Sequence, residues 1–170
     1  MILRYVLFVV FVTSSAAATA ATHCKSGEIT YFSCQIAKSE KVVSLCGSAF
    51  RDNDRAEAEI NDGAWLQYRF GRPSQLELVY PAKKEPLLTK FSAEYILAND
   101  NRLYSLMFTN SEFKYEVLFV HDWQILVEGR GKKIKLTCQG EPVTQRANNL
   151  NDFFQLVQDL SEQKNEEQFG

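Results

Sequence analysis

Short runs in which apolar and polar residues alternate, separated by polar turns, fill most of the chain and restrict its fold more than any other feature. A period of two places the apolar side chains on one face of an extended segment, so the pattern predicts half-buried antiparallel strands. The length, 170 residues, is that of one compact domain. We therefore expect a single all-β domain over 21–170, an antiparallel sandwich or barrel of about eight to nine strands.

Four hairpins can be placed from this pattern. They pair 29–36 with 41–46, 65–70 with 76–80, 103–108 with 113–119, and 123–128 with 133–138, and 90–97 is a further strand. In the second hairpin, pairing Phe70 with Leu76 would set Arg69 opposite Glu77 on the outer face. In the third, Phe108 would lie opposite Phe113, with a four-residue turn between them. In the fourth, Ile134 and Cys138 are expected to point into the core.

The period changes after Pro142, where apolar residues recur at helical spacing. This predicts a C-terminal α-helix at about 149–162, packed on the strands, with Asn149 or Asn151 as its N-cap. The apolar stripe consists of Leu150, Phe153, Phe154, Val157 and Leu160.

The first 20 residues have the features of a secretory signal peptide. Arg4 precedes a short apolar run, and Ala18 and Ala20 supply small residues at a cleavage site. The run is far shorter than the roughly 20 residues that span a bilayer. His23 before Cys24 does not fit a lipoprotein anchor. We expect a periplasmic or secreted protein without a membrane anchor.

Export makes the four cysteines candidates for disulfides, because extracytoplasmic compartments are oxidising. Their spacing does not fit a zinc site. Cys34 and Cys138 are both expected to face inward, whereas Cys46 faces the other way. This favours the pairs Cys34–Cys138 and Cys24–Cys46, and the other two pairings stay open.

The composition and the motifs do not favour most catalytic functions or nucleic-acid binding. Nineteen basic residues against 21 acidic ones provide no excess positive charge for nucleic acid. His121-Asp122 is interpreted as a polar turn, because no nucleophile motif accompanies it. The acids that a glycosidase would need lie in a charged loop or opposite Arg69 (Glu57, Glu59, Asp62 and Glu77). We expect no catalytic residues, metal or cofactor.

Two surface features are candidate contacts for a partner. Trp65 falls on the outer face of its strand, where a large rigid ring can contact a protein or a sugar. The turn Asn110, Ser111 and Glu112 projects from a well-patterned hairpin, as a recognition loop does. The acidic loop 51–63 could assist it. The basic edge formed by Arg130, Lys132, Lys133 and Lys135 is interpreted as a solubilising strand edge.

The residues of the pattern C…FSC…VSLC…LQYRFG…ELVYP resemble a family of small exported proteobacterial proteins that is largely uncharacterised. They include Cys34, Cys46, 66–71 and 77–81, and the resemblance extends to the hairpin around Asn110. This resemblance implies the all-β fold and an extracytoplasmic location, and it does not imply an activity. The tip that is usual in this family is Asn-Gly, whereas here it is Asn110-Ser111.

A weaker likeness is to periplasmic lysozyme inhibitors and to immunity proteins against amidases delivered by type VI secretion. We therefore expect a non-enzymatic protein-binding domain, an inhibitor or immunity protein against a peptidoglycan hydrolase. The alternative is a glycan or small-ligand binding module of the cell envelope that uses Trp65 or Trp123. The oligomeric state is left open.

Overall fold

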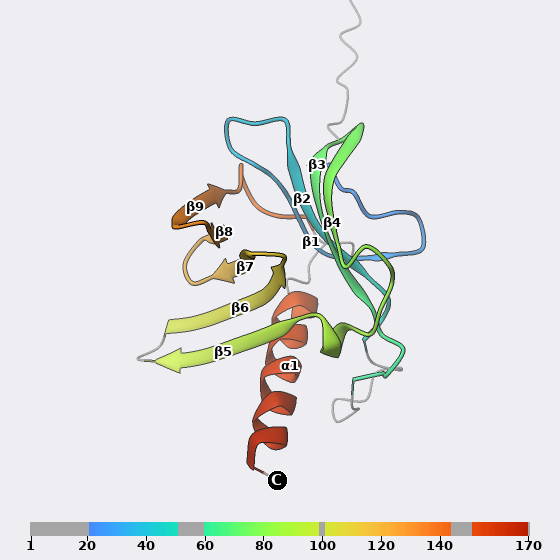
Figure 1. The fold of residues 1–170 in the computed structure, drawn as a ribbon, viewed down its shortest axis with the longest axis vertical. Helices are drawn as coiled ribbons and strands as arrows, with labels where there is room; N and C mark the ends of the chain where they lie inside the picture. Colours follow the sequence, from blue (N-terminus) through green and yellow to red (C-terminus); the bar gives the residue numbers. More distant parts are fainter. Residues whose placement is uncertain (1–20, 51–59, 99–100, 144–150, 170) are drawn as a thin grey trace, which may run out of the picture.

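The computed structural model describes residues 21–50, 60–98, 101–143 and 151–169, which form two antiparallel sheets and a C-terminal helix (Figure 1). The expected leader, residues 1–20, lies outside the described residues. The first sheet has the order β1 (Ile29–Gln35), β2 (Val42–Gly47), β3 (Leu66–Arg72), β4 (Gln75–Tyr80). The second has the order β5 (Ser92–Ala98), β6 (Asn101–Asn110), β7 (Phe113–Phe119), β8 (Trp123–Gly129), β9 (Lys132–Thr137). A 3-10 turn, η1 (Leu87–Thr89), precedes β5. The expected all-β fold with a C-terminal helix is confirmed, and of the two expected forms it is the sandwich, because the two sheets of the described residues do not close into a barrel.

Aromatic side chains on the facing sides of the two sheets form the core. The ring of Tyr68 on β3 lies 5.0 Å from that of Phe108 on β6, and Phe32 on β1 lies 4.7 Å from Trp123 on β8. Phe108 stacks on Tyr115 at 4.7 Å. Tilted and stacked aromatic pairs bury large apolar areas and add to the free energy of burial. The core therefore fixes which face of each sheet points outward.

The helix α1 (Asn151–Phe169) packs against both sheets at one side of the sandwich (Figure 1). Phe154 lies 4.3 Å from Tyr104, ring to ring, and Leu156 is fully buried although it was not in the predicted stripe. The Tyr95 backbone N–H donates to Ser161 Oγ, so the helix covers the free edge of β5. The helix runs beyond the expected end at residue 162. Leu150 and Asn149 lie outside the described residues.

The expected register of the β3–β4 hairpin is wrong by two residues. Phe70 pairs with Leu78 and Arg69 with Val79, because only two residues form the turn and a bulge follows at Gly71. Gly71 has φ +155°, and a Cβ there would lie 2.3 Å from a backbone oxygen, so the bulge requires glycine. The bulge leaves Leu76 exposed.

The β6–β7 hairpin also differs from its expected register by two residues. Phe108 pairs with Tyr115, and the strands continue to the pair Asn110 and Phe113. Only Ser111 and Glu112 form the turn, with Ser111 at φ +55°. Two-residue turns with positive φ match the twist of the flanking strands, which is why the tighter hairpin forms.

Both favoured disulfides are present, Cys34–Cys138 and Cys24–Cys46. The first joins β1 to the segment that leaves β9, and a backbone bridge between Ile36 and Cys138 lies beside it. Ile134 was expected in the core with Cys138, but it is 52% exposed, and β9 is the edge strand of its sheet with β8 as its neighbour. The Cys34–Cys138 bond therefore ties the two sheets together near the β9 end.

Replacing Cys34 and Cys138 together by serine should lower the free energy of unfolding by about 4–5 kcal/mol, because this disulfide closes a long loop. The bond spans 104 residues, against 22 for Cys24–Cys46. Urea denaturation measures the change. The matched double serine variant of Cys24 and Cys46 should lose about 3 kcal/mol through loop closure. A loss below about 1 kcal/mol for the long loop would contradict the loop-closure account.

Candidate functional site

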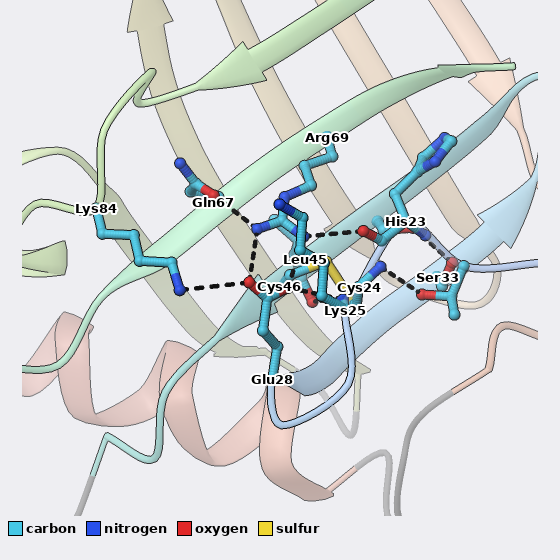
Figure 2. Close-up of polar contacts among 12 residues, drawn as sticks. His23, Cys24, Lys25, Glu28, Ser33, Leu45, Cys46, Gln67, Arg69 and Lys84 are labelled. Carbon is cyan, nitrogen blue, oxygen red and sulfur yellow. Dashed lines mark hydrogen bonds and ion pairs between the residues drawn. A yellow bond between two sulfur atoms is a disulfide. The ribbon is translucent and has the colours of Figure 1, made fainter. Parts of the chain in front are cut away.

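Residues 21–28, here named the N-terminal strap, lie across the outer face of the first sheet (Figure 2). The Cys24–Cys46 disulfide holds the strap to β2. Ser33 Oγ donates to the Ala21 carbonyl oxygen at 2.9 Å, and the His23 N–H donates to Ser44 Oγ at 3.0 Å. The strap thus satisfies small polar side chains that alternation places on the outer face.

Arg69 and Glu28 form a buried ion pair beneath the strap. Arg69 Nη1 lies 2.6 Å from Glu28 Oε2 and Nη2 lies 3.0 Å from Oε1, which is bidentate geometry. The guanidinium also donates to the His23 carbonyl oxygen and to Gln67 Oε1. The expected partner Glu77 instead contacts Lys41 at 2.7 Å. Arg69 is on the expected face, but that position is covered and 3% exposed.

The Glu28 carboxyl is ionised far below its ordinary range. Burial on its own would raise its pKa, but the hydrogen bonds from Arg69 and the Lys25 N–H, the charge of Arg69 and the nearby Lys84 outweigh burial. The pKa of Glu28 is lowered to about 2. The charged form is therefore the one that the folded chain stabilises.

Trp65 borders this network and is half-buried. The Lys84 ammonium lies 3.8 Å from the centre of the Trp65 ring and 3.4 Å from Glu28 Oε1. A cation over one ring face occupies a surface that a sugar would need for stacking. Trp123, the other aromatic residue considered for glycan binding, is 5% exposed and packs against Phe32 in the core.

The predicted contact residues Asn110, Ser111 and Glu112 lie together at the β6–β7 tip, next to the β8–β9 turn. Glu112 Oε1 accepts from Arg130 Nη2 at 2.5 Å. Arg130 in turn lies over the Phe113 ring, 5.4 Å from its centre. A Cβ at Gly129 would come 2.4 Å from Phe113 Cδ1, so the two turns pack closely. These contacts fix the tip, while Ser111 and Glu112 remain exposed.

An open groove of about 650 Å³ adjoins the tip. We name the tip and this groove the tip surface. Its lining includes Thr109, Ser111, Glu112, Lys114, Lys132 and Lys133. Residues with hydroxyl, ammonium and carboxylate groups therefore line the groove beside the turn. Sequence reasoning found the turn but not the groove, which forms only because the two hairpin turns lie side by side.

Within the part of the chain that the structure describes, the other residues considered for catalysis or metal binding do not form a site. His121 and Asp122 are exposed in the β7–β8 turn, where Asp122 accepts a hydrogen bond from Gln124. Residues 51–59 of the acidic loop, with Glu57 and Glu59, lie outside the described residues. The described residues contain no group of three or more His, Cys, Asp or Glu that could hold a metal ion. Nor is any helix within them long and apolar enough to cross a membrane.

Neither a family model, nor a curated protein, nor a solved structure matches this chain.

Replacing Glu28 by glutamine should lower the free energy of unfolding at pH 7 by about 3–5 kcal/mol, because it removes the charge that compensates buried Arg69. Because folding lowers the pKa of the Glu28 carboxyl from 4.5 to about 2, its ionised form stabilises the folded state fully above pH 4.5. This stabilisation decreases as the pH falls toward about 2. The difference between wild type and Glu28→Gln should therefore shrink across that window.

Urea denaturation at a series of pH values from 7 to about 2 measures this difference. Glu77→Gln is the control, because its half-exposed pair with Lys41 should be worth less than about 1 kcal/mol. A wild-type advantage over Glu28→Gln that stays constant down to pH 2 would contradict the linkage.

Proposed function

We propose that this chain is an exported, non-enzymatic binding protein that uses its tip surface to inhibit a peptidoglycan hydrolase, as an inhibitor or immunity protein. The observation that carries the proposal is the fixed, exposed Ser111-Glu112 turn beside a polar groove. The leader expected at residues 1–20 and the two disulfides support a periplasmic or secreted location.

A rigid projecting turn suits this task because an inhibitor must fill a cleft without losing much conformational entropy on binding. The close packing of Gly129 on Phe113 restrains the turn before binding, and the exposed Glu112–Arg130 ion pair adds only a small contribution. Ser111 and the ammonium groups of the groove then offer donors to the polar lining of a hydrolase cleft. Inhibition of this kind needs no catalytic group on the inhibitor.

Replacing Ser111 by arginine should weaken inhibition strongly while leaving the fold unchanged. Ser111 is exposed at the apex of the turn, so a long side chain obstructs a close-fitting partner without disturbing the core. The test adds the purified protein to a muramidase and to an amidase that clear a peptidoglycan suspension. We expect wild type to slow the clearing by one of them and Ser111→Arg to bind it about 30-fold more weakly, as expected for a central contact.

Ser74→Arg is the matched control, because Ser74 is exposed in the β3–β4 turn of the other sheet. It should inhibit as well as wild type. Equal inhibition by Ser111→Arg and wild type would place the contact elsewhere, and failure of wild type to inhibit either enzyme class would overturn the proposed function.

A further inference from the structure

Five apolar side chains occupy the outer face of the second sheet. They are Ile96, Leu103, Met107, Leu118 and Leu126, here named the apolar strip. They alternate with core residues such as Leu106, Val117 and Ile125, so they point away from the core. Ile96 pairs with Leu103, and Leu118 is diagonal to Met107 and Leu126 in the register. The strip is therefore continuous across β5 to β8.

The strip is unusual because the solvent face of an antiparallel sheet normally carries polar side chains. Ile96 is 42% exposed, and the other four are half-buried. Ser105 lies among them with no exposed surface, and its Oγ donates to Glu116 Oε1 at 2.6 Å. Of the carboxylates on this face, Glu116 is thus held by a neighbour, whereas Glu94, which pairs with Ser105 from β5, is exposed.

Lysines border the strip on the β9 side. Glu128 lies between Lys114 and Lys133 in the register, and Lys135 pairs with Leu126 of the strip. All three lysines are exposed, and the ion pairs among the described residues include none of them. Three ammonium groups against one carboxylate leave this border positive, although the whole chain has a formal net charge of −2.

The strip adjoins the tip surface. Thr109, Lys114, Glu128 and Lys133 line the groove and also form the last row of the outer face. Strand spacings give the whole face roughly 400 Å², about half of what one side of a stable protein interface buries. The groove residues of the tip surface overlap the last row of this face, and the turn 110–112 extends the surface beyond it. The first sheet and α1 pack on the inner face, and no described segment covers the outer one.

We propose that the strip and the tip surface form one continuous interface, and that the partner presents an apolar patch bordered by carboxylates that face β7 and β9. This inference rests on the proposed function and specifies the partner's chemistry. The apolar centre supplies the buried area, and the lysines orient the partner and accelerate encounter. The exposed lysines Lys114, Lys133 and Lys135 are complementary to carboxylates on an acidic protein surface.

The test measures affinity for the hydrolase that wild type inhibits, by calorimetry. Leu118→Ser removes an apolar contact and is compared with Leu76→Ser, a partly exposed leucine on β4. Lys135→Glu reverses a border charge and is compared with Lys83→Glu, an exposed lysine before η1. Thermal unfolding of each variant checks that the fold is retained.

We expect Leu118→Ser and Lys135→Glu each to weaken binding by about tenfold, and both controls to stay within about twofold of wild type. Raising the salt concentration should slow association of wild type more than that of Lys135→Glu. Equal affinities for all four variants, with inhibition by wild type intact, would overturn the shared interface and leave the proposed function standing. Absence of any inhibition by wild type would overturn both.

Two further outcomes identify a different occupant of the strip. Wild type that sediments with vesicles of one part phosphatidylglycerol to three parts phosphatidylethanolamine, and is released by Lys135→Glu, would show a lipid surface instead. A concentration-dependent dimer in light scattering that Leu118→Ser dissociates would show a second copy instead. Either result would overturn the inference.

Discussion

The buried ion pair between Arg69 and Glu28 determines what the first sheet can present to its surroundings. An isolated guanidinium in this position would be strongly unfavourable, so Arg69 requires a carboxylate and further acceptors. The N-terminal strap supplies them through Glu28 and the His23 carbonyl oxygen. Because these groups come from the strap, the strap must lie over the sheet, and the Cys24–Cys46 disulfide keeps it there.

The two sheets consequently have opposite roles. The outer face of the first sheet is closed by the strap, and its side chains Ser33, Ser44 and Gln67 are satisfied internally. The outer face of the second sheet carries the apolar strip and the lysine border, and it ends at the fixed turn with Ser111. Recognition by this chain is therefore expected on the second sheet, which the inner aromatic core and α1 support from behind.

Much of the fold follows from local pattern, and the errors have identifiable physical causes. Alternation predicts the strands, and it favours the two observed disulfides over the other two pairings because Cys34 and Cys46 fall on opposite faces. The two wrong registers arise from turn chemistry. In β3–β4 the two-residue turn and the bulge at Gly71 together shift the pairing by two residues, and in β6–β7 the tight turn at Ser111 does so alone. A polar run of four residues gives no sign of which two form the turn.

The candidate site was predictable only in part, for reasons of sequence distance. The tip emerges from the hairpin pattern, but the groove depends on a second turn at Arg130, which is 18 residues from Glu112. Glu28 is 41 residues from Arg69 and lies in a segment without periodicity, so nothing local connects them. The strip was missed because Met107 and Leu126 alternate with core residues that are equally apolar, which makes the two faces of these strands hard to distinguish.

Native-state hydrogen exchange, followed by mass spectrometry or NMR, tests most directly whether the strap belongs to the folded core. The N–H groups of His23, Lys25 and Glu28 are hydrogen-bonded within the strap network. The account predicts that they exchange only when the whole domain unfolds, together with those of β2 and β3. Exchange of these amides at the rate of an unstructured peptide, while β2 and β3 stay protected, would contradict it.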